Sequence, residues 1–281
     1  MSVIEKAVQS ALEEDLSTVG DITSIALFAT GDVASAVIRS KAQGVLSGCS
    51  LIAPVFRRCD PAVTVEVEAA DGDRIDCGTV LARLSGPVRG ILAGERSCLN
   101  FLQRLSGIAT MTARYAAAIA HTQCRLLDTR KTTPGLRFFE KAAVRDGGGR
   151  NHRYGLFDMM LIKDTHVKRS GGVANALHRA FAWRDAADMP CAVEIEVQSV
   201  TEFSDAFALG PDRIMLDNMS IDDMRTCVER RNAAGSRCEL EASGNVTIDT
   251  IADVAQTGVD YISVGALTHS APSLDIHLVI Q

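Results

Sequence analysis

The stretch DTRKTTPGLRFFEKAAVRDGGGRNHRYGLFDMMLIKDTH, residues 128–166, decides the fold that this sequence predicts. It begins at the end of the apolar run RLLD (125–128) and contains a second run, MMLIKD (159–164), with the helical segment LRFFEKAAVR (136–145) between the two. A strand, a helix and a second strand form the unit of a parallel sheet, because parallel neighbours need a crossover connection. We therefore expect α/β structure here.

The same rhythm continues to the end of the chain. Four more apolar runs follow, separated by helical segments: AVEIEV (192–197), RIMLD (213–217), CELEASG (238–244) and DYISVG (260–265). Six strands can be placed in this way, with room for one more that the pattern does not reveal. Such an alternation closes as a barrel or lies open as a doubly wound sheet.

The positions of the polar residues favour the barrel. Each of the six runs carries ionisable, hydroxyl or glycine residues at its carboxyl end, namely Asp128 to Lys131, Lys163 and Asp164, Glu194 and Glu196, Asp217, Glu241 to Gly244, and Gly265. A barrel gathers all its strand ends around one site at its top face. An open sheet concentrates its ligand at one switch point instead.

The first third of the chain has a different pattern. A short amphipathic helix at 2–14 is followed by β-like residues from 33 to 45 and by two alternating runs at 63–69 and 79–86. These features predict an antiparallel sheet with a helix or two, an α+β module. Residues 86–121 are helical in pattern, and we expect Gly107 to break them into two helices. The predicted domains are residues 1–107 and 108–267.

Charge points to a compact anionic ligand. The chain of 281 residues has a net charge of −6, but the segment from Arg130 to Arg153 has seven Lys or Arg against two acids. A local balance of +5 in an acidic protein suits a small anion, whereas the acidic remainder argues against general affinity for nucleic acids or membrane surfaces.

Other features of the sequence predict a cytoplasmic protein. Its eight cysteines include no CxxC pair and are expected to be reduced. The acidic, amphipathic start is unlike a signal peptide, and no run of about 18 apolar residues is present to span a bilayer.

Five cationic or imidazole side chains lie on three neighbouring segments: Arg130, Lys131, His152, Arg153 and Lys163. Arginine forks match carboxylates through paired bonds and lysine supplies a point charge, so this set predicts a substrate with several acidic groups. The glycine run at 147–149 would let the loop carry His152 and Arg153 into the site. A salt-bridged surface is the alternative interpretation.

Glu196 and Asp217 end neighbouring predicted strands and form the acidic counterpart of this set. Two carboxylates beside a polyanion fit Mg²⁺, held directly or through water, although they could instead orient the lysines. The absence of HExxH and of a Cys/His cluster argues against zinc. The segments EASGN (241–245) and SVGALTHS (263–270) follow strands with small residues, as phosphate-binding loops do, or as plain tight turns do.

Long blocks of the sequence resemble the quinolinate phosphoribosyltransferase family. The resemblance extends over GERSCLNFLQRLSGIAT (94–110), DTRKTTPGLR (128–137), GGGRNHRYGLFDMMLIKDTH (147–166), EIEVQS (194–199), LDNM (216–219), EASGN and YISVGALTHS (261–270). Asp146, Thr165 and Asn245 depart from the family pattern, in which Cys, Asn and Gly are usual at these positions. They adjoin the charged residues without replacing any of them.

The resemblance implies an N-terminal α+β open sandwich followed by an incomplete α/β barrel of about seven strands, with residues 268–281 packed back on the first domain. It implies a pentosyltransferase that uses Mg²⁺ and makes nicotinate mononucleotide, pyrophosphate and CO₂ from quinolinate and phosphoribosyl pyrophosphate, in de novo NAD biosynthesis. It also implies a homodimer or larger oligomer with shared sites.

The same resemblance implies a role for each site residue. The implied quinolinate ligands are Arg96 from a neighbouring subunit, Arg130, His152, Arg153 and Lys163. The implied catalytic residues are Lys131, Glu196 and Asp217, which would also serve the phosphoribosyl pyrophosphate, with Glu196 and Asp217 at the metal. Residues implied around the 5-phosphate are Ser243, Gly244, Asn245, Val264, Gly265, Ala266 and His269.

Two rival functions stay open from the sequence. A ModD-type paralogue shares the fold and much of the cationic region but would use a different anionic acceptor. A barrel without catalytic activity would bind a phosphorylated metabolite tightly and show no turnover. The complete cationic set and the LFDMMLIKDTH segment (156–166) favour the quinolinate interpretation.

Overall fold

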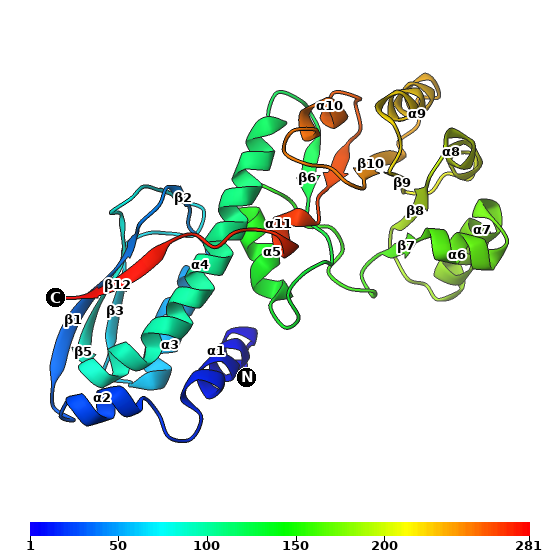
Figure 1. The fold of residues 1–281 in the computed structure, drawn as a ribbon. Helices are drawn as coiled ribbons and strands as arrows, with labels where there is room; N and C mark the ends of the chain where they lie inside the picture. The colour runs from blue at the N-terminus through cyan, green and yellow to red at the C-terminus, as the bar shows by residue number, and fades with distance from the viewer. The chain divides into compact units, whose positions relative to one another are not determined.

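The computed structural model describes residues 1–281, which divide into two compact units (Figure 1). The first unit comprises Met1–Ala113, Thr132–Gly148 and Ala266–Gln281, and the second comprises Arg114–Lys131 and Gly149–Gly265. We had expected residues 108–267 to form one domain. The compact units follow a different division, in which Thr132–Gly148 joins the first unit, and the predicted domains 1–107 and 108–267 stay a prediction.

The first unit is built on an antiparallel sheet with the order β12-β1-β5-β3. Its strands are β1 (Val33–Ser40), β3 (Thr64–Val67), β5 (Val80–Pro87) and β12 (Ile276–Ile280), and a separate pair is formed by β2 (Gly44–Val45) and β4 (Arg74–Ile75). The last strand of the chain pairs with the first, so that Ile38 lies opposite Leu278. The α+β module predicted from the alternating runs is confirmed.

Helices complete the first unit. They are α1 (Val3–Leu16), α2 (Ile22–Leu27), α3 (Cys49–Cys59), α4 (Val88–Ala118), α5 (Arg137–Asp146) and α11 (Ala266–His269). The last residues of α4, from Arg114 on, belong to the second unit. Helix α1 begins with a capping box between Ser2 and Glu5, which satisfies backbone N–H groups that have no partner within the helix. It packs on α3, which buries Leu51, Val55 and Phe56.

The predicted helix break at Gly107 is wrong. Helix α4 continues without interruption through 31 residues. The glycine serves a close approach instead, because a Cβ at this position would lie 2.0 Å from the backbone oxygen of Pro272 in the returning C-terminal segment. A contact so distant in sequence leaves no local signal, and glycine in a helix interior was therefore misread as a breaker.

The second unit contains a six-stranded parallel sheet with the order β6-β11-β10-β9-β8-β7. The strands are β6 (Arg125–Leu127), β7 (Met160–Ile162), β8 (Val193–Val197), β9 (Arg213–Asp217), β10 (Glu239–Ser243) and β11 (Tyr261–Ser263). All six predicted strands are confirmed. Arg150 forms an isolated parallel bridge with Leu127 on the free side of β6. This bridge adds a short seventh extended segment beside the six strands, which together form an arc.

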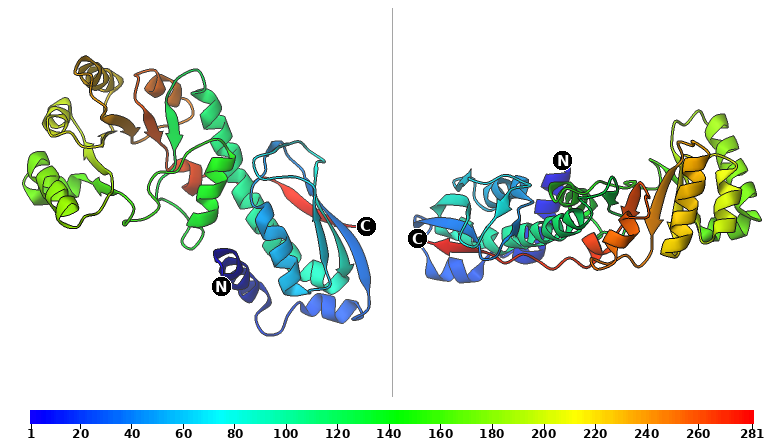
Figure 2. Two further views of the ribbon diagram at one scale, coloured as in Figure 1. Left: turned by 180° about the vertical axis from the view of Figure 1, so that it is seen from behind. Right: turned by 90° about the horizontal axis from the view of Figure 1, so that it is seen from above.

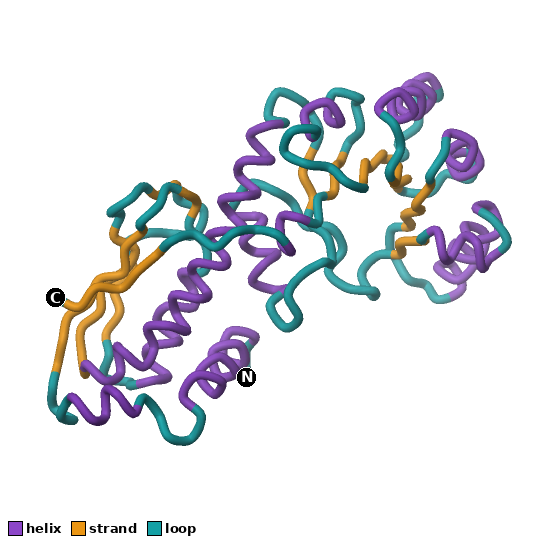
Figure 3. Tube along the Cα trace, viewed as in Figure 1, coloured by secondary structure: helices purple, strands orange, loops and turns teal.

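Helices lie along the outer side of this arc of strands (Figures 2 and 3). They are α6 (Asp164–Ser170), α7 (Val173–Ala186), α8 (Val200–Phe207), α9 (Ile221–Ala233) and α10 (Ile251–Ala255). Helix α7 contacts β7 and β8, and α8 contacts β8 and β9, as in an α/β barrel. Because β6 and β7 do not pair, the barrel is incomplete.

None of the helices is both long enough and apolar enough to cross a membrane. All eight cysteines are free, and four of them, Cys98, Cys124, Cys227 and Cys238, are buried.

Candidate active site

Two charged side chains meet where β7 and β8 end. Ile162, the last residue of β7, lies opposite Ile195, so the residues that follow each of them, Lys163 and Glu196, are placed side by side. Nζ of Lys163 lies 4.0 Å from Oε2 of Glu196. The strand register therefore brings one cation of the predicted set to one of the two predicted metal carboxylates.

Asp217 lies at the carboxyl end of the next strand, beside the loop that follows β10. Ser243 pairs with Asp217 in the sheet, and its backbone oxygen accepts the N–H of Asn218 at 2.9 Å. The Asn218 side chain accepts a hydrogen bond from Nδ2 of Asn245 at 3.0 Å. A Cβ on Gly244 (φ +96°) would lie 2.3 Å from Oδ1 of Asn218, so only glycine allows these two loops to pack together.

Repulsion between carboxylates marks this part of the site. Partial burial raises the pKa of Glu196, and the neighbouring charge of Asp217 raises it further, whereas Lys163 lowers it. Two carboxylates that repel each other at the ends of parallel strands are a donor set that a hydrated divalent cation fits. Glu196 and Asp217 therefore could hold Mg²⁺.

Arg130 and Arg153 are close enough to influence each other. Burial lowers the pKa of Arg153, and the positive charge of Arg130 lowers it further. Nη1 of Arg153 donates to the backbone oxygen of Met159 at 3.1 Å, which fixes one edge of its guanidinium. Two guanidinium groups near enough to repel each other could bind an anion between them.

The loop that carries Arg153 is anchored by Asp128, which is fully buried at the end of β6. Oδ1 of Asp128 accepts the backbone N–H of His152, and Oδ2 accepts Nδ2 of Asn151, both at 2.7 Å. The glycine-rich loop therefore returns to a fixed point of the barrel directly before the arginine.

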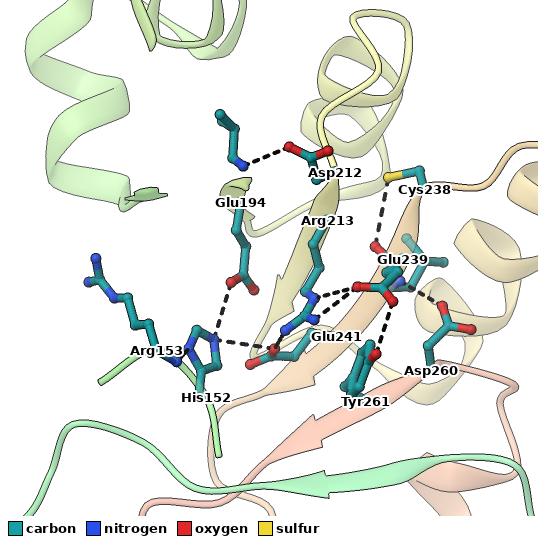
Figure 4. Close-up of polar contacts among 12 residues, drawn as sticks. His152, Arg153, Glu194, Asp212, Arg213, Cys238, Glu239, Glu241, Asp260 and Tyr261 are labelled. Carbon is teal, nitrogen blue, oxygen red and sulfur yellow. Dashed lines mark hydrogen bonds and ion pairs between the residues drawn. The ribbon is translucent and has the colours of Figure 1, made fainter. Parts of the chain in front are cut away.

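His152 points into the interior of the barrel (Figure 4). Its Nε2 lies 3.1 Å from Oε2 of Glu194 and 3.4 Å from Oε2 of Glu241, and both carboxylates are fully buried. Its Nδ1 accepts the backbone N–H of Arg153 at 2.7 Å. The ring thus lies between two glutamates of the barrel strands on one side and the backbone of Arg153 on the other.

Arg213, the first residue of β9, joins this buried cluster to the other strands (Figure 4). It donates to Glu241 through Nη1 at 3.0 Å and to Glu239 through Nη2 at 2.9 Å. Its guanidinium carbon lies 4.1 Å from the centre of the Tyr261 ring, and the Tyr261 hydroxyl donates to Glu239 at 2.9 Å. Four strands therefore share one network of charges.

The network raises the pKa values of His152 and Glu194. Burial lowers the pKa of His152, but the contacts and charges of Glu194 and Glu241 outweigh burial and raise it to about 9. The backbone N–H of Arg153 opposes this rise, because protonation of Nδ1 would break the hydrogen bond that Nδ1 accepts. Burial and the charge of Glu241 raise the pKa of Glu194 to about 7, and His152 and Arg213 oppose that rise.

Most of the predicted site residues lie in the second unit. They are Arg130, Lys131, His152, Arg153, Lys163, Glu196, Asp217, Ser243, Gly244, Asn245, Val264 and Gly265. Three others, Arg96, Ala266 and His269, belong to the first unit, where Arg96 is exposed on α4 and His269 ends α11.

The comparisons with known proteins agree with this geometry. Residues 21–106 match the profile described as Quinolinate phosphoribosyl transferase, N-terminal domain, and residues 108–279 match that of the C-terminal domain. The chain belongs to the quinolinate phosphoribosyltransferase family.

Relatives from different kingdoms support this membership in the quinolinate phosphoribosyltransferase family. The chloroplastic nicotinate-nucleotide pyrophosphorylase [carboxylating] of Oryza sativa is 41% identical, over 99% of this chain and 78% of the rice protein. A probable enzyme of the same name from Bacillus subtilis is 40% identical, over 98% of this chain and 92% of its own. The solved nicotinate-nucleotide pyrophosphorylase of Francisella tularensis superposes with a TM-score of 0.92 at 38% identity, covering 99% and 96% of the two chains.

Sequence reasoning did not assign Glu194 and Glu241 to the site of this quinolinate phosphoribosyltransferase family member. A signal was present in VEIEV (193–197), because alternate residues of a strand share a face and Glu194 must therefore point to the same side as Glu196. Two glutamates on the inner face of one barrel strand predict charged residues deeper in the barrel, below those at the strand ends. Their shared partner His152 could not be identified from spacing alone.

Proposed function

We propose that the protein transfers the phosphoribosyl group of phosphoribosyl pyrophosphate to quinolinate and decarboxylates the product, giving nicotinate mononucleotide, pyrophosphate and CO₂. The observation that carries the proposal is the combination of cations and carboxylates at the strand ends of the second unit. Cations on the β6 and β7 sides of the arc, Arg130, Arg153 and Lys163, accompany the carboxylate pair Glu196 and Asp217 at the strand ends. Relatives that match nearly the whole chain are named for this reaction.

The cationic side chains suit quinolinate, a pyridine with two neighbouring carboxylates. Arg130 and Arg153 can each bind a carboxylate through two parallel N–H bonds, and Lys163 supplies a point charge. Nicotinate lacks one of these carboxylates, so it would leave part of the positive charge without a partner. The site therefore favours the diacid.

The acidic pair and Lys131 suit the other substrate. As the bond between ribose C1 and pyrophosphate breaks, positive charge grows on the sugar and negative charge on the leaving group. Glu196 and Asp217 can stabilise the sugar, and Lys131 the pyrophosphate. Mg²⁺ at this carboxylate pair would neutralise the phosphates. The loops with Ser243, Gly244 and Asn245 and with Val264 and Gly265 would hold the 5-phosphate.

The chemistry needs no covalent bond to the enzyme. The ring nitrogen of quinolinate attacks C1 while pyrophosphate leaves with the electron pair of its bond. The resulting pyridinium withdraws electrons, so the neighbouring carboxylate leaves as CO₂ and the electron pair left on the ring carbon takes up a proton. Positioning and electrostatic stabilisation by the residues above are the protein's contribution.

Arg96 would act in a neighbouring subunit, and the active protein would be a homodimer or a larger oligomer. The family resemblance suggests this role, and the exposure of Arg96 on α4 is compatible with it. The free cysteines suit a reducing compartment such as the cytoplasm.

Product analysis tests the proposal. Purified protein with Mg²⁺, phosphoribosyl pyrophosphate and quinolinate is expected to form nicotinate mononucleotide, and nicotinate is expected not to replace quinolinate. Folded protein that forms no product from quinolinate would contradict the proposal. Turnover of another anionic acceptor would then point to the ModD-type alternative, which the names of the relatives do not favour.

A further inference from the structure

The Asp217 carboxylate receives hydrogen bonds from two side-chain amides. Nδ2 of Asn218 donates to its Oδ2 at 2.9 Å, and Nε2 of Gln198 reaches the same oxygen at 3.5 Å. Because both donors meet one oxygen, they fix the rotation of the carboxylate and leave Oδ1 for other partners. Asp217 is close enough to raise the pKa of Glu196, so this rotation decides how the acidic pair presents its oxygens.

Asn218 can donate to Asp217 in only one orientation of its amide. An ionised carboxylate accepts hydrogen bonds and cannot donate them, so the NH₂ group of Asn218 must point to Asp217 and its oxygen away from it. That oxygen accepts Nδ2 of Asn245 at 3.0 Å. Asn245 therefore stabilises the orientation in which Asn218 is a donor to the carboxylate.

The backbone holds both asparagines in place. Asn218 has φ +53° and Asn245 has φ +51°, a left-handed conformation that asparagine adopts more readily than most residues. The N–H of Asn218 donates to the backbone oxygen of Ser243 at 2.9 Å, and the missing Cβ of Gly244 lets the Asn218 side chain approach. Residues other than glycine keep a positive φ only where their surroundings hold them, and the contact between the loops after β9 and β10 does so here.

We propose that Asn218 and Asn245 are positioning residues that orient the Asp217 carboxylate. Asn245 holds the amide of Asn218, and this amide turns Asp217 so that Oδ1 is available to the metal or to the ribose of phosphoribosyl pyrophosphate. The loop after β10 therefore acts on the reacting sugar as well as on the 5-phosphate. The inference rests on the proposed function, because it takes Asp217 as a group that serves this substrate.

Glycine substitutions test these contacts, because glycine adopts a positive φ without strain and removes only the side chain. Calorimetry in the presence of Mg²⁺ gives the Kd for phosphoribosyl pyrophosphate and, separately, the Kd for quinolinate. Asn218→Gly is expected to raise the Kd for phosphoribosyl pyrophosphate about fivefold, and Asn245→Gly about threefold. The Kd for quinolinate is expected to change by less than about twofold in both variants.

Two double-mutant cycles show whether each residue acts through the next. In an Asn218→Gly background, Asn245→Gly is expected to change the Kd for phosphoribosyl pyrophosphate by less than about twofold. In an Asp217→Ala background, Asn218→Gly is expected to do no more than that, because the group that it orients is missing.

Asp188→Gly is the matched control. Asp188 also has a positive φ, +48°, but it is exposed and follows α7, away from the strand ends of the site. Its substitution is expected to leave both Kd values within about twofold of wild type.

Independent effects would overturn the inference. If Asn245 bound the 5-phosphate through its side chain, its substitution would weaken binding by the same factor with and without Asn218. An unchanged Kd for phosphoribosyl pyrophosphate in Asn218→Gly, or equal losses for both substrates, would also contradict it. Wild-type protein that forms no nicotinate mononucleotide would refute the proposed function, whereas active wild type with independent effects would refute only the inference drawn here.

Discussion

The buried charge network predicts that Arg213→Met strongly destabilises the second unit. Breaking a buried ion pair from one side costs about 3–5 kcal/mol, because the other charge stays buried without its partner. His152 remains near Glu241 and offsets part of this loss, and Glu239 is 43% exposed and can be solvated. The lost contact with the Tyr261 ring adds about 0.5–1 kcal/mol. We expect a net loss of about 3 kcal/mol in the free energy of unfolding.

The chain offers a convenient probe for this measurement. Its single tryptophan, Trp183, lies in α7 of the second unit, so fluorescence during urea unfolding reports on the unit that contains Arg213. Protein concentration is kept constant because association changes apparent stability. Arg225→Met is the control, since Arg225 pairs with Asp222 on the surface and its loss is expected to cost less than about 1 kcal/mol.

Two results would refute the reasoning about Arg213. One is a loss no larger than that of the Arg225 control. The other is that the free-energy losses of Arg213→Met and Glu241→Gln simply add in the double variant. Neutralising Glu241 is expected to recover about 1–2 kcal/mol of the loss caused by Arg213→Met.

Three further predictions concern the site and its surroundings. Arg96→Ala and Lys131→Ala are each expected to be inactive, and their mixture to regain part of the turnover through hybrid dimers. Gly244→Ala is expected to raise the KM for phosphoribosyl pyrophosphate about tenfold, because the positive φ and the Asn218 contact exclude a side chain. Asp146→Asn is expected to keep or raise the free energy of unfolding at pH 7, since burial raises the pKa of Asp146 more than the hydrogen bond from Ser47 lowers it.

Each of these has a result that would count against it. No recovery in the mixture would argue against a site shared between subunits, and an unchanged KM in Gly244→Ala would argue against a phosphate in that loop. The sign of the Asp146 effect follows from linkage. A raised pKa makes the ionised carboxyl unfavourable in the folded state, so any gain of the asparagine appears above that pKa and disappears as pH falls towards 4. A clear loss of stability at pH 7 would contradict it.

Local pattern predicted the second unit well, because each strand is a short apolar run with polar residues at its carboxyl end. Lys163 and Glu196 could be expected to meet, since parallel strands bring their ends to one edge. Contacts between distant residues could not be predicted in this way. The approach of Pro272 to Gly107, which accounts for a glycine in the middle of α4, and the meeting of His152 with Glu194 depend on tertiary packing alone. Helix α6 was also missed because it has only seven residues.

The most direct test of the account is the fate of the 2-carboxylate of quinolinate. Quinolinate labelled with ¹³C at this carboxylate is incubated with the protein, Mg²⁺ and phosphoribosyl pyrophosphate. The account predicts one labelled CO₂ for each nicotinate mononucleotide formed, and no labelled CO₂ when phosphoribosyl pyrophosphate is omitted. Release of label without phosphoribosyl pyrophosphate, or formation of nucleotide that retains the label, would contradict it.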